Sequence, residues 1–597
     1  MKWFILCLLA SVKLFSLEPN PPVWPDNVIV LKTDDPYAQE KVDKVFSVNG
    51  GHATKAGEPT PGEFSNDRYA ILFEPGVHTL NVNVGFYTSI IGLGKAPKDT
   101  TISTVTSENG NFCYSVGALD NFWRSAENFY TKPSKTWNGK VSMLWAVSQA
   151  APMRRVFVDG DLCLYEYVDS TCPNPYHLAG FSSGGFMADC HVNGAIFSGT
   201  QQQWLTRNSY MGSWHDGNWN MVFVGCTNAP PSHCSNKNGA PYTTVAETPV
   251  IAEKPYIMYD NASDRYYLMV PKLETNKVGE TKDYDNVDQI DFHNVYVATE
   301  KDSADVINGK LAEGLHIVLC PGNYTLTESI QVTKPNTIIL GIGFPTLIAS
   351  TASCHGATNP SPCITVGNVD GVRIAGVLLQ AGTTGISTLL EWGQKGYAGD
   401  ANNPGFLYDC FARVGGPYDP ATHPVGAEQM VVINNGNVIG DNLWVWRADH
   451  TVAGRVVNGE NPCTTGIQVN GDDVIMYGLA SEHTLGNITE WNGEKGRVYF
   501  YQSEYPYDVE PSYSGISYKV GDSVQNHQAW GVGVYCYFRD HPVAAQSAIQ
   551  TPTGSGIHFT NSVSVFLDGH GEISHVINST GNPVTHVNDQ SYICDFP

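Results

Sequence analysis

Charged side chains are scarce in this sequence of 597 residues, and most of those present are acidic. Aspartate, glutamate, lysine and arginine make up 15% of the chain, and 58 acidic against 34 basic residues give a formal net charge of −24. Such a surface repels phosphate backbones and anionic polysaccharides. We therefore expect no nucleic-acid partner, whereas a neutral partner or substrate is compatible with this charge.

Long apolar runs are absent after the first 17 residues. The opening MKWFILCLLASVKLFSL has a basic start and an apolar stretch that Lys13 interrupts. This stretch is too short to span a bilayer and is typical of a secretory signal. We assign residues 1–17 to a signal peptide and expect a secreted, extracellular monomer without a membrane partner.

The cysteines favour an oxidising compartment. Of the 14 cysteines, Cys7 lies in the predicted signal, which leaves an odd number for the mature chain, so at least one thiol is expected to be unpaired unless it bonds another chain. Three close spacings could close small disulfide loops, at Cys163/Cys172, Cys226/Cys234 and Cys354/Cys363. Four sequons would accept N-linked glycans in a eukaryotic host, at Asn261, Asn323, Asn487 and Asn578.

Sustained helical periodicity is also lacking, and short apolar stretches separated by glycine and asparagine take its place. The segments GVRIAGVLLQAG, NGNVIGDNLWVW and NGDDVIMYGLAS each have a polar corner followed by β-branched or apolar residues. A β-sandwich would show hairpin signals instead of these repeated corners. The pattern predicts an all-β protein built from parallel β-helix coils.

An imperfect internal duplication predicts two such β-helices. ILFEPGVHTL (71–80) recurs as IVLCPGNYTL (317–326), and a G-x-G step follows each copy. Pro75-Gly76 and Pro321-Gly322 should therefore occupy equivalent places. We expect a first right-handed β-helix over residues 18–271, a polar linker over 272–292 and a second right-handed β-helix over 293–597, packed side by side.

Two glutamates in the second half have the spacing of one coil. Glu482 and Glu504 are 22 residues apart, and coils of roughly 20–30 residues stack about 4.8 Å apart. Two carboxyls stacked this closely cannot both ionise cheaply, so one is held protonated, as a general acid requires. A glutamate pair is more often solvated surface, but the aromatic residues crowded around this pair favour a sugar-binding site.

The segments around these glutamates resemble the glycoside hydrolase family 55 β-1,3-glucanases. The segments that carry the resemblance are GLASEHT, WNGEKGRVYFYQSEYPYD, LWVWRADH, SGTQQQWLTRNS and WNMVFVG. The resemblance implies two tandem parallel β-helices and hydrolysis of β-1,3-glucan, commonly from chain ends with inversion. It also implies that Glu504 is the general acid and that Glu482 lies beside it.

Further site residues follow from the same resemblance. In GTQQQW, either Gln202 or Gln203 would position the attacking water, with Thr227 as a nearby hydroxyl where the family would have a serine. The substrate cleft is expected where the two β-helices meet, with Trp204 or a neighbouring aromatic facing Glu504. The predicted substrate-binding residues are Trp204, Trp446, Trp491, Tyr501, Tyr505 and Gln502.

Other signals receive structural interpretations. Gly471 to Asp473 should form a coil corner, and Arg154 and Arg155 should form ion pairs with Asp159 or Asp161. His450 and His483 lack metal-ligand spacing, and strand alternation turns each away from the acidic residue before it, so we expect no metal or cofactor.

Two other functions remain open at this stage. A polygalacturonase or polysaccharide lyase on the same scaffold would need a calcium site or a basic cleft, which the acidic composition disfavours. A non-catalytic wall-binding protein could keep the fold without the chemistry.

Overall fold

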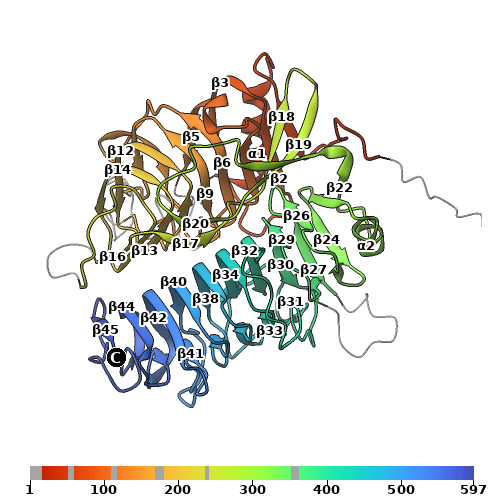
Figure 1. Ribbon diagram of the computed structural model, residues 1–597. Helices are drawn as coiled ribbons and strands as arrows, with labels where there is room; N and C mark the ends of the chain where they lie inside the picture. Colours follow the sequence, from red (N-terminus) through yellow and green to blue (C-terminus); the bar gives the residue numbers. More distant parts are fainter. Residues whose placement is uncertain (1–16, 52–59, 109–116, 168–179, 236–240, 351–361) are drawn as a thin grey trace, which may run out of the picture.

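The computed structural model describes residues 17–51, 60–108, 117–167, 180–235, 241–350 and 362–597, and it contains two parallel β-helices lying side by side (Figure 1). The first is coloured red to yellow and the second green to blue. The prediction of two tandem β-helices is confirmed.

The first β-helix is one large sheet wound into coils, whose strand pairs are parallel apart from β7 with β8. Its strands are β1 (Val28–Leu31), β2 (Tyr69–Phe73), β3 (Gly76–Asn83), β4 (Thr88–Gly92), β5 (Thr100–Ser107), β6 (Arg124–Thr131), β7 (Thr136–Trp137), β8 (Lys140–Trp145), β9 (Pro152–Val158), β10 (Asp161–Cys163), β11 (Phe186–Ala188), β12 (His191–Gly199), β13 (Gln203–Arg207), β14 (Tyr210–Asp216), β15 (Asn220–Val224) and β16 (Tyr242–Val245).

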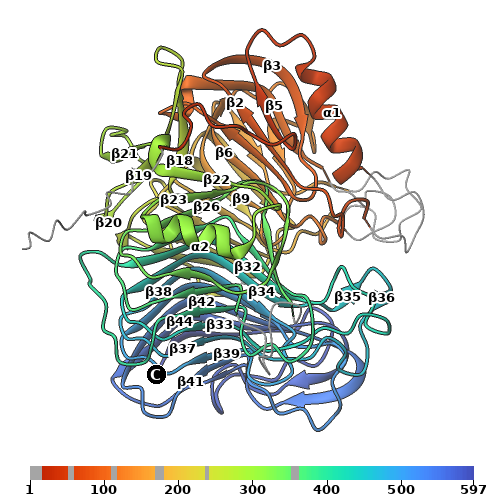
Figure 2. The same ribbon diagram turned by 90° about the vertical axis from the view of Figure 1, so that its right-hand side faces the viewer.

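The second β-helix has two long parallel stacks of strands, seen nearly edge-on in Figure 2. One stack contains β22 (Val295–Ala298), β23 (His316–Leu319), β24 (Asn323–Leu326), β26 (Ile338–Gly341), β27 (Thr346–Ala349), β29 (Arg373–Ala375), β30 (Leu378–Ala381), β32 (Gly405–Val414), β34 (Val438–Arg447), β38 (Ile475–Glu482), β40 (Gly496–Glu504), β42 (Asn526–Ala545), β44 (Gly556–Ile573) and β45 (Gln590–Phe596), of which β45 pairs antiparallel. The other contains β25 (Ile330–Val332), β28 (Ile364–Val366), β31 (Leu390–Trp392), β33 (Ala427–Ile433), β37 (Cys463–Val469), β39 (Thr489–Trp491), β41 (Tyr518–Val520) and β43 (Ile549–Gln550). A hairpin of β35 (His450–Thr451) and β36 (Gly454–Arg455) projects from the side of this β-helix (Figure 2).

Both β-helices begin in the same way, as the duplication predicted. A helix, α1 (Ala38–Asn49) or α2 (Ala304–Glu313), lies between the first two strands of each half. Pro75-Gly76 then leads into β3 and Pro321-Gly322 into β24, and both glycines have a positive φ that side chains disfavour. The two Pro-Gly sites are therefore equivalent, which confirms the prediction.

The connection between the halves is more structured than a plain linker. The predicted linker, 272–292, contains β20 (Glu274–Lys277) and β21 (Val287–Asp291) and runs into the short helix η2 (Phe292–Asn294). These strands pair antiparallel with β17 (Thr248–Ile251) and β19 (Arg265–Pro271), and β19 also pairs with β18 (Tyr256–Asp260). The remaining short helix, η1 (Pro97–Asp99), lies between β4 and β5. Antiparallel pairing excludes this region from the coils, so the connecting region starts earlier than predicted.

Each β-helix has its own apolar interior, and further cores fill the joint between them. One joint core packs Phe186 and Leu205 of the first half with Ile439 and Tyr477 of the second. Another joint core is aromatic and includes Trp123. The two β-helices are therefore packed against each other through buried side chains of both halves.

A buried ionic network crosses the same joint. Asp441 of β34 accepts from Arg154 Nη1 at 2.7 Å and from Arg207 Nε at 2.8 Å, and Arg154 also forks onto Asp409 of β32. Five cations and five carboxylates take part, namely Arg154, Arg155, Arg207, Lys254, Lys277, Glu127, Asp189, Glu253, Asp409 and Asp441. The network therefore contains equal numbers of positive and negative groups.

The predicted partners of the paired arginines are wrong. Arg154 pairs with Asp409 and Asp441 across the joint, and Arg155 pairs with Asp189, not with Asp159 or Asp161. Because a strand rises about 3.3 Å per residue, Asp159 and Asp161 lie roughly 13–23 Å along the chain from these arginines, beyond the reach of their side chains. The interpretation of both arginines as structural ion pairs is confirmed.

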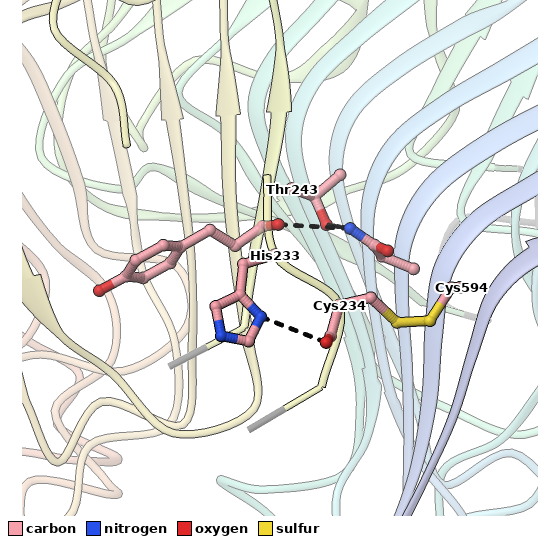
Figure 3. Close-up of a disulfide and its surroundings, with 6 residues drawn as sticks. His233, Cys234, Thr243 and Cys594 are labelled. Carbon is pink, nitrogen blue, oxygen red and sulfur yellow. Dashed lines mark hydrogen bonds between the residues drawn. A yellow bond between two sulfur atoms is a disulfide. The ribbon is translucent and has the colours of Figure 1, made fainter. Parts of the chain in front are cut away.

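A disulfide ties the C-terminal end of the second half to the first half (Figure 3). Cys234 bonds Cys594 across 360 residues, so the predicted Cys226/Cys234 pair is wrong and Cys226 is a free thiol. Cys163 and Cys363 are also free thiols, whereas their predicted partners Cys172 and Cys354 lie outside the described residues. Among the described residues, no helix is long and apolar enough to cross a bilayer.

The joint network yields a stability prediction. Asp441→Asn should lower the free energy of unfolding by about 3–5 kcal/mol, because two buried arginines lose their shared counter-charge. Asp473→Asn is the matched control, since Asp473 pairs at 3.7 Å with the exposed Lys495 and should cost about 0–1 kcal/mol. Thermal unfolding followed by circular dichroism measures both, and equal losses would contradict the assigned role of the network.

Candidate active site

Glu482 and Glu504 end two adjacent strands at the joint between the β-helices. Strand β38 pairs in parallel with β40, with Leu479 opposite Tyr501 and Ala480 opposite Gln502. Two residues further along the same register, Glu482 lies opposite Glu504. The 22-residue spacing therefore stacks the two carboxyls on neighbouring coils, as predicted.

Glu482 is held by N–H donors from both β-helices. Its Oε1 accepts from Gln149 Nε2 at 3.0 Å and from Gln502 Nε2 at 2.6 Å, and its Oε2 accepts from Trp444 Nε1 at 2.7 Å. Gln149 belongs to the first half and the other two donors to the second. Three donors on one buried carboxyl fix its orientation and favour its ionised form.

Glu504 has different surroundings. The Tyr507 hydroxyl donates to its Oε2, which leaves Oε1 available to carry a proton. Glu504 is 8% exposed, whereas Glu482 is 2% exposed. Of the two carboxyls, Glu504 is therefore the one with more access to solvent and to a ligand.

Burial raises the pKa of both carboxyls. The pKa of Glu504 rises to about 7 because of burial and the nearby charge of Asp449, although the Tyr507 hydrogen bond opposes the rise. The pKa of Glu482 rises to about 8 because of burial and repulsion from Glu504. The pair titrates as a unit, and the three N–H donors on Glu482 favour placing the retained proton on Glu504.

First-half residues continue the hydrogen-bond network away from Glu482. Gln149 Nε2 lies 3.3 Å from Ser183 Oγ, and Gln203 Nε2 donates to the same hydroxyl at 3.2 Å. These side chains and Gln502 line a small cavity of about 20 Å³, which has room for one water. Among the described residues, the buried amide oxygens of Gln203 and Gln502 have no protein partner, so both could accept from that water.

The structure separates the predicted water-positioning residues. Gln203 belongs to this network, whereas Gln202 hydrogen-bonds in the described structure only through its backbone. Thr227 is remote from this network. Gln203 pairs with Asn220 at the start of β15, whereas Thr227 follows the other end of that strand. The Thr227 prediction is wrong, since the cavity lies at the starting end of these strands.

Two of the predicted substrate-binding residues lie at the site. Gln502 contacts Glu482 directly, and Trp446 is the strand neighbour of Glu482 in β34. Trp204, Trp491, Tyr501 and Tyr505 point into the interiors of the β-helices and are fully buried there. Those four predictions are wrong, because these aromatic rings fill the apolar interiors of the coils.

A cleft of about 490 Å³ opens beside Tyr507 and draws on both halves. Glu63, Phe64 and Asp120 contribute from the first half, and the β35–β36 hairpin contributes from the second. The full lining is Glu63, Phe64, Asp120, Asp449, His450, Thr451, Val452, Gly454, Arg455, Tyr507, Tyr537 and Arg539. A cleft therefore lies where the two β-helices meet, and its role as the substrate cleft stays a prediction.

Several residues of the site were not predicted from the sequence. Trp444 is two residues before Trp446, so alternation places both on one face and could have identified it. Tyr507 lies in the segment that carries the family resemblance. Gln149 and Ser183 have no such signal, because they reach Glu482 only through the packing of one β-helix on the other.

Comparison with known proteins identifies the family. Residues 295–504 match the family described as LAM55 pectate lyase-like domain. The exo-beta-1,3-glucanase of Streptomyces sp. (strain SirexAA-E / ActE) is 38% identical over 588 residues, which cover 96% of this chain and 89% of that protein. The chain belongs to glycoside hydrolase family 55.

Solved structures agree with this assignment. The structure of sacteLam55A from Streptomyces sp. SirexAA-E matches with a TM-score of 0.86 and 37% identity, covering 97% of this chain and 100% of that one. A glutamate-to-alanine variant of the same protein in complex with glucose matches with a TM-score of 0.85 and 37% identity, covering 98% and 100%. The family 55 chain described here is therefore a glycoside hydrolase.

The two adjacent glutamines of this family 55 chain provide a matched test of the water site. Gln203→Ala should lower kcat on β-1,3-glucan by about 10–100-fold, because a misplaced water loses part of the advantage of a fixed attack geometry. Gln202→Ala should remain close to the parental rate. Initial rates of sugar release measure both variants, and a larger defect in Gln202→Ala would contradict the assignment.

Proposed function

We propose that this protein hydrolyses β-1,3-glucan, acting from chain ends with inversion and using Glu504 as the general acid. The observation that carries the proposal is the stacked carboxyl pair, in which two neighbouring glutamates have unlike partners. One is oriented by three N–H donors, and the other can carry a proton beside the cleft. Unlike environments for two carboxyls are typical of an acid and its partner.

The substrate class is supported by charge, by aromatic residues and by relatives. The net charge of −24 suits a neutral polysaccharide. Phe64, Tyr507 and Tyr537 line the cleft, where flat aromatic rings can pack against sugar rings. A relative at 38% identity is named an exo-beta-1,3-glucanase, and a related structure contains glucose.

In this proposal Glu504 protonates the leaving glycosidic oxygen as the bond to the anomeric carbon breaks. Its pKa of about 7 keeps a large fraction protonated at neutral and mildly acidic pH. A water on the opposite face of the sugar attacks the anomeric carbon as the glycosidic bond breaks, and the proton that the water releases passes to solvent. Gln203 and Ser183 help to position that water through the network that reaches Glu482.

Glu482 is proposed to orient and tune Glu504. An inverting pair of carboxylates is about 6.5–9.5 Å apart, whereas adjacent coils lie about 4.8 Å apart. Glu482 is also less exposed than Glu504, and its carboxyl group accepts three hydrogen bonds from N–H donors. Its negative charge favours the protonated form of Glu504 by like-charge repulsion.

The two competing functions have less support. A lyase or polygalacturonase would need a basic or calcium-binding cleft. The cleft beside Tyr507 is not basic, because Glu63, Asp120 and Asp449 offset His450, Arg455 and Arg539, and among the described residues no three acidic, histidine or cysteine side chains gather as a metal site would require. A non-catalytic binding protein would not need a buried carboxyl pair, which is costly to retain.

The proposal includes secretion of a monomeric enzyme. The Cys234–Cys594 disulfide supports an oxidising destination, and the basic and apolar start of the chain supports a cleaved signal. Sequencing the N-terminus of protein collected from culture medium tests the cleavage near residue 17.

Replacing Glu504 tests the central role. Glu504→Gln keeps the shape but removes the transferable proton, so turnover on laminarin should fall by about 10²–10⁴-fold while binding survives. On aryl β-glucosides with good leaving groups the defect should shrink, because little protonation is needed. Parental turnover of Glu504→Gln on laminarin would remove Glu504 from the mechanism.

Glu482→Gln is the paired variant in the same experiment. It should remain active, and the alkaline limb of its kcat/KM profile should move to lower pH, because Glu504 then loses its proton earlier. A limb that stays in place would show that Glu482 exerts no charge effect on Glu504.

A further inference from the structure

The mouth of the cleft holds a histidine between two carboxylates. His450 Nε2 lies 2.5 Å from Glu63 Oε1, and His450 Nδ1 lies 3.2 Å from Asp449 Oδ1. A ring whose two nitrogens both face carboxylate oxygens must donate from both, so it is an imidazolium. The expectation that alternation separates His450 from Asp449 is wrong, because β34 ends at Arg447 and Asp449 lies in the turn.

This cluster joins the two halves and is partly shielded from water. Glu63 belongs to the first half and lies 387 residues from His450. The side chain of Glu63 is 3% exposed and that of His450 is 27% exposed. The His450 ring packs against Phe64 at 5.6 Å and against Trp446 at 5.4 Å. Charges held this way are screened less than charges on the open surface.

The cluster also lies close to the proposed acid. His483 Nε2 is 4.0 Å from Asp449 Oδ1, and the His483 ring meets the Tyr507 ring edge-on at 4.5 Å. Tyr507 in turn donates to Glu504. The negative charge of Asp449 is therefore separated from Glu504 by only one layer of side chains.

We propose that Glu63, His450 and Asp449 form a positioning triad whose fixed charges, held across the two halves, set the pH range in which Glu504 is protonated. The proposal rests on the proposed role of Glu504 as general acid. None of the three residues takes part in proton transfer to the substrate in this account.

The charges of Asp449 and His450 act on the protonation of Glu504 in opposite directions. Asp449 stays ionised, because His450 and His483 outweigh the effect of burial and hold the pKa of Asp449 well below its usual range. His450 stays charged, because Asp449 and Glu63 outweigh burial and raise its pKa well above the ordinary value. The Asp449 charge stabilises protonated Glu504, whereas the His450 charge stabilises its ionised form.

Other titratable and charged groups surround the triad, and they are the same in the parental enzyme and in the variants of the triad. Burial lowers the pKa of His483, whose Nε2 lies 4.0 Å from Asp449. The remaining charged or titratable groups near the triad and the acid are Asp120, Arg447, Arg455, Glu482, Asp508 and Arg539, together with the hydroxyls of Tyr507, Tyr535 and Tyr537.

Opposite shifts of the pH profile test the triad. With laminarin as substrate, the alkaline limb of kcat/KM should move to lower pH in Asp449→Asn and to higher pH in His450→Gln. Each shift should be about 1–2 pH units, as expected for a unit charge roughly 6–12 Å away at an effective dielectric constant of about 20. The double variant should return the limb close to its parental position.

The controls separate this proposal from a structural role and from the proposed function. His191→Gln removes a similar histidine, which pairs with Glu280 at 3.1 Å away from the cleft, and it should leave the limb in place. Glu63→Gln should give a smaller shift of the alkaline limb, in the same direction as Asp449→Asn. It replaces Asp449→Asn or His450→Gln in the test if either of those variants fails to fold.

Shifts of Asp449→Asn and His450→Gln in the same direction, or no shift in either, would overturn the triad. Either result leaves the proposed function intact if Glu504→Gln has still lost turnover on laminarin. If Glu504→Gln is fully active, the proposed function itself fails.

Discussion

The ion pairs between Arg154, Arg207 and Asp441 determine how the two β-helices are aligned. Both arginines lie in the first half and the aspartate lies in the second, and all three are buried. Moving one β-helix by a single coil would leave these charges unpaired in a medium of low dielectric constant. The alignment matters for chemistry, because the donor from Gln149 to Glu482 crosses the same joint.

The fixed alignment makes two similar residues chemically different. Glu482 and Glu504 occupy equivalent positions on adjacent coils, so the repeat itself would give them equal environments. The first β-helix breaks this symmetry by placing Gln149 against Glu482, and the turn after β40 breaks it again by placing Tyr507 against Glu504. The two carboxyls of a repetitive scaffold thereby acquire the unlike environments that the proposed acid and its partner require.

Local sequence patterns predicted the features that depend on one β-helix alone. They did not predict the contacts between the two β-helices. The Pro-Gly duplication gave the paired β-helices, and the 22-residue spacing gave the stacked glutamates. Aromatic residues near the glutamates suggested sugar contacts, yet Trp491 and Tyr501 fill the interior, because composition alone does not show which face of a strand lines the inside of the coil. Gln149 could not have been found, since its role depends on contacts 333 residues away. The same limit applies to Cys234, whose partner Cys594 lies in the other half.

The unequal roles of the two glutamates are tested most directly by the anomeric form of the sugar that is first released. Proton NMR spectra recorded within minutes of adding enzyme to laminarin distinguish α- from β-glucose before mutarotation. If Glu504 is the acid and a water attacks from the opposite face, the first product is the α-anomer. Initial release of β-glucose would contradict this account, because retention requires a glycosyl-enzyme intermediate and would make Glu482 the nucleophile.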